Sequence, residues 1–240
     1  LDTVLEVLSQ EGIKTVTLGG VQANPTLAMA RTGIALCRQE QVDFILAVGG
    51  GSVIDSAKCI ADGVGNPDLD VWQFFLKKAE PVQALPVGTV LTLSASGSEM
   101  SASCVITNEE TGLKRGFNSV THRPLFSVCN PELTYSVSRF QTGCGTVDIM
   151  MHTLERYFSN DKNTMLVDNL SEGLLRTVLP CGPKLLANPA DYDARAEIMW
   201  AGSLSHNGLP GTAKTAAWAS HLSQMELSAT YDVPPAAALA

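Results

Sequence analysis

The sequence predicts an α/β domain over residues 1–137, followed by an all-helical domain over residues 138–240. In the first part, short apolar runs bounded by glycine alternate with helical stretches, which is typical of βαβ units around a parallel sheet covered on both faces. In the second part, long segments carry apolar residues at helical spacing and are separated by proline, glycine and asparagine. Hydrophobic residues make up 45% of the 240 residues and charged residues 17%, so the chain has the composition of a protein that folds around a core.

The charge and the cysteines exclude several classes of protein. The net charge of −8, from 16 basic and 24 acidic residues, argues against nucleic-acid binding through phosphate neutralisation. No apolar run approaches the ~18–20 residues that a membrane span needs, so no membrane association is expected. Six scattered cysteines without a CxxC pair favour reduced thiols and a cytoplasmic location. Because the sequence opens inside an apparent helix and stops in an alanine-rich run, we expect it to be truncated at both ends.

The helices of the first part are expected over residues 1–12, 24–38 and 52–62. Asn24 supplies an N-cap for the second of them, and Pro25 stands at its first helical position. Strands are expected at Thr15–Leu18, Phe44–Val48, Gln83–Val87, Thr89–Leu93, Ser103–Thr107, Leu113–Phe117 and Pro124–Val128. The turn-rich residues 108–112 predict a hairpin between two of these strands. Four long helices are expected in the second part, over Ser138–Phe158, Thr164–Leu186, Asp191–Leu204 and Thr212–Ala229.

A glycine-rich turn follows the Phe44–Val48 strand, in the sequence GGGSVIDSAK over residues 49–58. Three glycines let the backbone approach an anion closely, and Ser52 adds a hydroxyl where the N–H groups of a new helix are free. This pattern predicts a pyrophosphate site, with a plain tight turn as the alternative. Asp55 and Lys58 share one face of the helix, where they could equally form an intrahelical ion pair.

Small hydroxyl residues gather in a second segment, Thr92–Glu99, directly after a predicted strand. Hydroxyls and exposed amides suit phosphate or ribose contacts, although an ordinary serine-rich turn has the same composition. Lys114, in the predicted hairpin, could place one cation near a cofactor or simply lie on the surface.

Asp148 and His152 stand four residues apart in the first helix of the second part. This spacing puts both side chains on one helix face, where a carboxylate and an imidazole can chelate a divalent ion; a hydrogen-bonded surface pair is the alternative. His221 lies on a mostly apolar helix and, taken alone, is interpreted as a core histidine. His122 and His206 have no partner pattern and are interpreted as structural or exposed.

Together these segments resemble the iron-containing (group III) alcohol dehydrogenase family, especially its butanol dehydrogenase and broad aldehyde reductase branch. The resemblance covers essentially the whole sequence and follows the family's order. It implies a Rossmann-like N-terminal domain that binds NAD or NADP, an all-helical domain that holds Fe(II) or Zn(II), and the overall architecture of dehydroquinate synthase. The matching segments are Asn24-Pro25, Val48–Lys58, Thr92–Glu99, Gly145–His152 with Glu155, and His221 with Tyr231–Pro234.

The resemblance also implies a reaction and a set of site residues. The reaction is hydride transfer between a nicotinamide and a small alcohol or aldehyde, with the ion as a Lewis acid and no protein nucleophile. A homodimer is compatible with the family. By resemblance, the cofactor would contact Asn24, Gly50, Gly51, Ser52, Asp55, Thr92, Ser96, Ser98, Thr107 and Lys114, and the metal would be held by Asp148, His152 and His221.

The sequence departs from the family around the metal. The family's fourth ligand is a histidine followed by glycine, where this sequence has Pro235 and Ala236. Met225 replaces a further histidine one turn after His221, and Ala217 replaces an acid. Proline has no side-chain donor atom, whereas three protein ligands plus water can still form a catalytic site. We therefore expect the ion to bind more weakly than in the family, or not at all.

Two other functions remain open at this point. The missing ligand and the expected truncation favour a degenerate, non-catalytic nucleotide-binding fragment of the same family. A related polyol or sugar-phosphate dehydrogenase, or a dehydroquinate-synthase-like lyase, shares the architecture, although the glycine-rich and hydroxyl-rich segments fit the alcohol branch better. The sequence does not distinguish NAD from NADP, iron from zinc, or one small alcohol from another.

Overall fold

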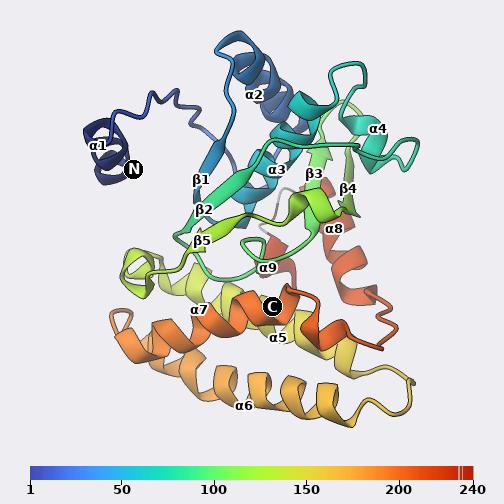
Figure 1. The fold of residues 1–240 in the computed structure, drawn as a ribbon. Coiled ribbons are helices and arrows are strands. Elements are labelled where there is room, and N and C mark those ends of the chain that lie inside the picture. The colour runs from blue at the N-terminus through green and yellow to red at the C-terminus, as the bar shows by residue number, and fades with distance from the viewer. Residues whose placement is uncertain (232, 234, 240) are drawn as a thin grey trace.

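The computed structural model describes residues 1–231, 233 and 235–239. A parallel sheet with its helices forms one half of the molecule, and a layer of helices forms the other (Figure 1). The elements are α1 (Asp2–Gln10), α2 (Leu27–Gln39), β1 (Ile45–Gly49), α3 (Gly51–Gly65), α4 (Trp72–Phe75), β2 (Val87–Leu91), β3 (Ser103–Asn108), β4 (Leu113–Asn118), β5 (Phe126–Val128), α5 (Arg139–Tyr157), α6 (Met165–Ala187), α7 (Tyr192–His206), α8 (Ala219–Tyr231) and α9 (Pro235–Leu239). Short 3₁₀ turns lie at Val120–His122, Pro131–Thr134 and Leu209–Gly211.

The main sheet is parallel and has the order β1-β2-β5. The central strand β2 is buried along its whole length, as a parallel strand between two neighbours should be. Gly49 ends β1, and its carbonyl accepts a hydrogen bond of 3.0 Å from the amide of Thr92, directly after β2. The glycine-rich turn and the hydroxyl-rich segment therefore start side by side at the carboxyl edge of the sheet, where ligands bind in open α/β folds.

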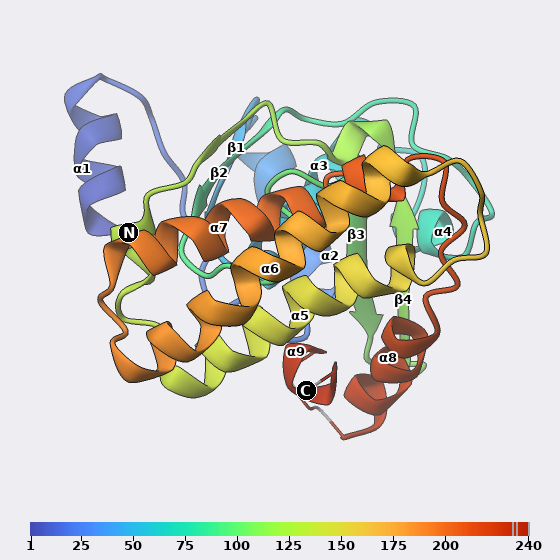
Figure 2. The ribbon, with the colours of Figure 1, turned by 90° about the horizontal axis from the view of Figure 1, so that it is seen from below.

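Apolar clusters connect the two halves. Side chains of α3 pack on β1 and β2, and Met199 of α7 joins this cluster. A separate cluster fills the space between α5, α6 and α7 and includes Ile149, Val178 and Leu185. These three helices form one layer in Figure 2, whereas α1 stands apart and buries none of its residues.

The expected coverage of the sheet on both faces is only partial. Phe126 and Val128 point to the same face of the edge strand β5 and are 49% and 45% exposed, so no described helix covers that face of β5 completely. The antiparallel hairpin of β3 and β4 forms as predicted, around the turn at residues 109–112.

Two predicted strands are wrong. Thr15–Leu18 is irregular, because a strand needs a hydrogen-bonding neighbour and the described part of the chain offers none there. Of Gln83–Val87, only Val87 belongs to a strand. The amide of Leu85 instead donates to the carbonyl of Ala61 on α3, and Pro86 has no amide to contribute to a ladder.

Two helices begin later than predicted. Thr26, rather than Asn24, caps α2, since its side chain accepts a hydrogen bond of 3.2 Å from the amide of Met29. The last predicted helix began at Thr212, but α8 begins at Ala219. The intervening residues are irregular, and Trp218 has a positive φ of 55°.

No helix among the described residues is both long and apolar enough to span a bilayer. All six cysteines are free thiols, and Cys129 is the exposed one.

The close contact between α5 and the Thr92–Glu99 segment after β2 leads to a testable prediction. A Cβ on Gly145 would lie 2.4 Å from the carbonyl oxygen of Ser94, a backbone atom that cannot move aside alone. Gly145→Ala should therefore destabilise the protein by ~1–3 kcal/mol, as overpacking does. A Cβ on Gly143, on the same helix, would meet only Leu186 at 3.7 Å, so Gly143→Ala should leave stability equal or higher. Denaturant unfolding of both variants checks this, and equal midpoints would contradict it.

Candidate metal centre and nucleotide-binding loops

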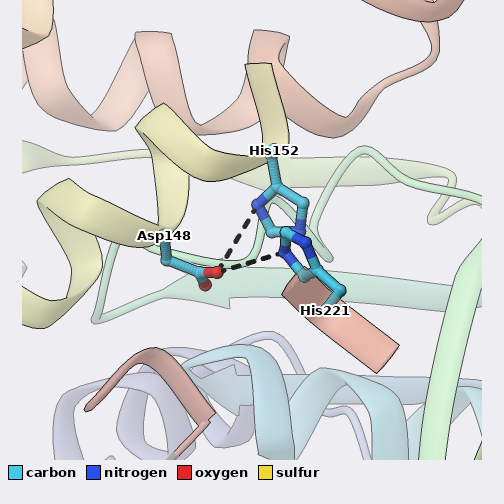
Figure 3. A group of neighbouring side chains, drawn as sticks. All are labelled: Asp148, His152 and His221. Carbon is cyan, nitrogen blue, oxygen red and sulfur yellow. Dashed lines mark ion pairs between the residues drawn. The ribbon is translucent and has the colours of Figure 1, made fainter. Parts of the chain in front are cut away.

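Asp148 and His152 on α5 converge with His221 on α8 (Figure 3). Asp148 Oδ1 lies 3.7 Å from His152 Nδ1 and 3.6 Å from His221 Nε2. One donor atom from each of the three residues lies within 4.8 Å of the others. The structure thus brings together the three residues that the sequence nominated as metal ligands, from helices about 70 residues apart in the chain.

The donor atoms of this cluster fit a cation. His152 Nδ1 and His221 Nε2 are buried and have no hydrogen-bond partner among the described residues. Leaving two buried nitrogens unpaired beside a carboxylate is costly, and a divalent ion would bond all three groups. Burial holds the pKa of His152 well below its usual value despite the neighbouring Asp148, so its lone pair is available at neutral pH. Two imidazoles and a carboxylate suit Fe(II) or Zn(II).

Glu155 holds the His221 ring from its other side. His221 Nδ1 makes a short hydrogen bond to Glu155 Oε2, and Glu155 Oε1 accepts a bond of 2.5 Å from the amide of Ser220. Burial lowers the pKa of His221, but the interactions with the nearby carboxylates of Asp148 and Glu155 outweigh burial and raise that pKa. The carboxylate fixes which nitrogen faces Asp148, as carboxylate partners of metal-binding histidines do. Its spacing in the sequence, seven residues after Asp148, would have revealed that it shares their helix face.

His206 lies against the same cluster, although its sequence position shows no partner. Its ring centre is 4.3 Å from that of His152 and 5.8 Å from that of Trp218. Arg156 donates to His206 Nδ1 over 3.1 Å and stacks over the Trp218 ring at 4.3 Å. Burial lowers the pKa of Arg156 to about 10, and burial together with Arg156 holds the pKa of His206 well below its usual value. Only the three-dimensional fold shows this neighbourhood.

The sequence left His122 as either structural or exposed, and the structure shows that it is structural. It is fully buried, with Nε2 2.6 Å from Asp62 and Nδ1 2.9 Å from the carbonyl of Ala102.

The glycines of the predicted pyrophosphate site permit close contact between two loops. A Cβ on Gly51 would lie 2.2 Å from Ser96 Oγ, and one on Gly50 would lie 3.2 Å from Leu93. The Ser52 hydroxyl donates to the carbonyl of Ala23 over 2.6 Å, so this hydroxyl is already used within the protein.

Asp55 and Lys58 both bind the hydroxyl-rich segment. Lys58 is 1% exposed, and its Nζ donates to the carbonyl of Ser98 (2.7 Å), to Ser98 Oγ (2.9 Å) and to the carbonyl of Ser103 (2.8 Å). Asp55 accepts from Ser98 Oγ at 2.6 Å and from the amide of Val105 at 3.0 Å. Burial raises the pKa of Asp55 and lowers that of Lys58. The pair fixes the shape of the segment, and direct contact of Asp55 or Ser98 with a cofactor stays a prediction.

Lys114 is buried rather than on the surface. It is 4% exposed, and its Nζ lies 2.8 Å from Asn24 Oδ1. Thr107 stands opposite it in the hairpin register, with a buried hydroxyl that bonds no other described group. Asn24, Thr107 and Lys114 thus form one polar cluster, while Thr92 and Ser96 lie half-buried at the carboxyl edge of the sheet.

Two family patterns match the chain. The pattern described as "Iron-containing alcohol dehydrogenase" matches residues 1–131, and "Fe-containing alcohol dehydrogenase family, C-terminal" matches residues 142–240. The chain belongs to the iron-containing alcohol dehydrogenase family. The resemblance inferred from the sequence motifs is therefore confirmed.

Alignments with two named relatives cover the whole length of this chain. It is 46% identical over 239 residues to the probable NADH-dependent butanol dehydrogenase 2 of Bacillus subtilis, and 38% identical over 242 residues to the NADPH-dependent aldehyde reductase YqhD of Escherichia coli. These alignments cover 100% of this chain but 61% and 62% of the relatives. The solved NADH-dependent butanol dehydrogenase A of Thermotoga maritima superposes with a TM-score of 0.96 at 36% identity, over 99% of this chain and 60% of that one. The chain spans about three-fifths of the length of these relatives. The superposition confirms the predicted fold class.

The predicted loss of the fourth ligand concerns Pro235, whose side chain lies outside the described residues, as do residues 232 and 234 of the neighbouring motif. That prediction stands on the sequence alone.

The contact of Glu155 with His221 makes a testable prediction. Glu155→Gln keeps the size of the side chain but removes the charge that orients the ring, so the affinity for Zn(II) should fall roughly 10–100-fold. Glu172→Gln on α6 should leave the affinity unchanged, because Glu172 accepts hydrogen bonds from Tyr157 and Arg176 and lies outside the metal cluster. Competition with a chromogenic chelator measures both, and equal affinities would show that Glu155 does not support the site.

Proposed function

We propose that this chain carries the site of a metal-dependent, NAD(P)-linked alcohol dehydrogenase or aldehyde reductase. The observation that carries the proposal is the buried cluster of Asp148, His152 and His221, with two imidazole nitrogens that lack partners among the described residues. Relatives named as NADH-dependent butanol dehydrogenases and as an NADPH-dependent aldehyde reductase support the substrate class, a small alcohol or aldehyde. They also support either nicotinamide as cofactor.

Residues of the helical half would bind the metal, and residues of the sheet half would bind the cofactor. Asp148, His152 and His221 would hold the ion, and a bound Fe(II) or Zn(II) supplies Lewis-acid polarisation of the substrate oxygen. Gly50 and Gly51, at the start of α3, would let the cofactor pyrophosphate approach the backbone and the positive end of the helix. A bound nicotinamide supplies or accepts the hydride.

Contacts between the halves fix the distance from the loops to the metal cluster. The Glu99 side chain accepts a hydrogen bond of 2.5 Å from Ser203 of α7, and Arg123 donates to the carbonyl of Asn207 over 3.0 Å. A Cβ on Gly97 would lie 2.7 Å from the carbonyl oxygen of Gly202, so the hydroxyl-rich segment lies directly on α7. Hydride transfer requires such a fixed geometry, because small displacements of the reacting atoms cost large factors in rate.

A non-catalytic nucleotide-binding protein remains the second candidate, favoured by Pro235 at the position of the fourth ligand. The six free thiols fit the cytoplasmic location that we propose for either function.

The function is tested with the purified chain loaded with Fe(II) or Zn(II). We expect oxidation of NADH or NADPH with butanal, dependent on the added metal, and a loss of about 100-fold or more in His221→Ala because a metal ligand is removed. Glu226→Gln is the matched control on the same helix, since Glu226 is exposed and contacts only Arg115 among the described ion pairs. Bound metal without turnover of any small aldehyde or alcohol would contradict the proposal.

The same preparation separates the second candidate. Nucleotide binding without metal uptake would identify the non-catalytic protein, and elemental analysis of Pro235→His then asks whether one imidazole restores the ion. Restored uptake would support the assigned ligand set, whereas no gain would count against it.

The glycine-rich turn is tested independently of turnover. In Gly51→Ala the new methyl group would collide with the side chain of Ser96, so Ser96 must move and NADH binding should weaken at least about 10-fold. Gly173→Ala, where nothing lies within 4 Å of the added Cβ, is the control. Fluorescence titration with NADH measures both, and an unchanged Kd in Gly51→Ala would place the cofactor elsewhere.

A further inference from the structure

His206 ends α7 beside the metal cluster, and its hydrogen-bonding state follows from its neighbour. Arg156 donates from its guanidinium to His206 Nδ1 over 3.1 Å. A guanidinium has only donors and stays protonated, so Nδ1 must accept and carries no hydrogen. The neutral ring therefore has its hydrogen on Nε2.

The surroundings of the ring leave Nε2 as its open polar atom. The His152 and Trp218 rings lie 4.3 Å and 5.8 Å from it, centre to centre, and the His206 Cβ would be 2.8 Å from a Cβ on Gly97. Within the described part of the chain, no group hydrogen-bonds Nε2, and the residue is half-buried. A donor with no partner thus stands between the metal cluster and the segment proposed to bind the cofactor.

The same tautomer argues against a role as a metal ligand. To coordinate through Nε2, a neutral ring must carry its hydrogen on Nδ1, where it would point at the Arg156 donor. His206 also lies outside the group whose donor atoms gather within 4.8 Å. It is therefore not a replacement for the imidazole missing at position 235.

We propose that His206 donates a hydrogen bond from Nε2 to the oxygen of the bound alcohol or aldehyde, and that Arg156 positions it for this role. This inference rests on the proposed function, since it assumes that an oxygen-bearing substrate binds beside the metal cluster. It adds a substrate contact from α7, outside the ligand set on α5 and α8.

Arg156 is suited to position the ring because it joins three segments. Its Nη1 donates to the carbonyl of His152 over 2.6 Å and to that of Ser205 over 3.0 Å, and the guanidinium stacks on Trp218. These contacts fix the guanidinium, so its bond to His206 has one geometry. Arg156 contacts no substrate in this proposal and acts only through His206.

The tautomer is tested without turnover or metal. Two-bond ¹H–¹⁵N correlation spectra of the histidine-labelled chain distinguish the two neutral tautomers, and the His206→Gln spectrum identifies the His206 signals. We expect the Nε2–H form in the wild type and a shift toward Nδ1–H in Arg156→Met. An Nδ1–H tautomer in the wild type overturns the proposal.

The substrate contact is tested by binding of butanol to the zinc-loaded chain, measured by calorimetry. His206→Phe keeps a ring but has no donor, whereas His206→Gln keeps a donor at a similar position. We expect the Kd for butanol to rise about 3–10-fold in His206→Phe, as for one lost hydrogen bond, and to stay near the wild-type value in His206→Gln. Zinc content should be the same in all three proteins.

Each of the other possible results of the zinc and butanol measurements leads to a different conclusion. Loss of zinc in both His206 variants would make the residue a ligand and overturn the proposal, and equal weakening of butanol binding in both would reduce it to a structural role. Absence of butanol binding to the wild type also overturns it. Butanol binding without turnover would instead show that the proposed function fails while the contact to His206 stands.

Discussion

The site depends on a buried carboxylate that faces two imidazole nitrogens. Asp148 lies within 4 Å of one nitrogen on each of His152 and His221, and neither nitrogen has another partner in the described ranges. Without a cation, such a group is costly, because polar atoms in an apolar interior lose their water without replacement. The presence of this cluster in the core therefore indicates a functional site, because the cluster does not stabilise the fold by itself.

Close approach of backbones is the second constraint, and glycine makes it achievable. Gly145 of α5 lies against the Ser94 carbonyl, and Gly97 lies against the Gly202 carbonyl of α7. Any side chain at these positions would push the serine segment away from the helices that hold the metal cluster. The short separation between the proposed cofactor loop and the cluster thus rests on residues that have no chemistry of their own.

Much of the fold could be predicted from local patterns, and the failures have physical causes. The long helices α5, α6 and α7 were predicted within a few residues because each has a polar residue at its start, Ser138, Thr164 or Asp191, and a periodic apolar face. Thr15–Leu18 has the composition of a strand but no neighbour to pair with among the described residues, and composition says nothing about neighbours.

Site residues that share one helix could be predicted from their spacing in the sequence, whereas site residues on different elements could not. Spacing of four reveals Asp148 with His152, but nothing local connects either to His206 or links Arg156 to Trp218. Lys58 could be predicted on the face of Asp55, whereas its target, the carbonyl of Ser98, lies 40 residues away. Family resemblance was needed to nominate His221, which alone has the pattern of a core histidine.

The placement of His221 shows why an irregular segment can be decisive. The residues between α7 and α8 form no helix, yet they are tied to the helical layer: Lys214 binds Asp168 of α6, and the amide of Thr215 donates to Asp161. Trp218 then takes a left-handed backbone conformation, which disfavours a bulky residue, and the Arg156 guanidinium stacks on its ring. These contacts fix the position of the chain just before α8. There, Glu155 accepts a hydrogen bond from the Ser220 amide at the start of α8 and binds the His221 imidazole. A regular helix from Thr212, as the apolar period predicted, would lack this bend, so the departure from helical geometry is what brings the third donor to the carboxylate.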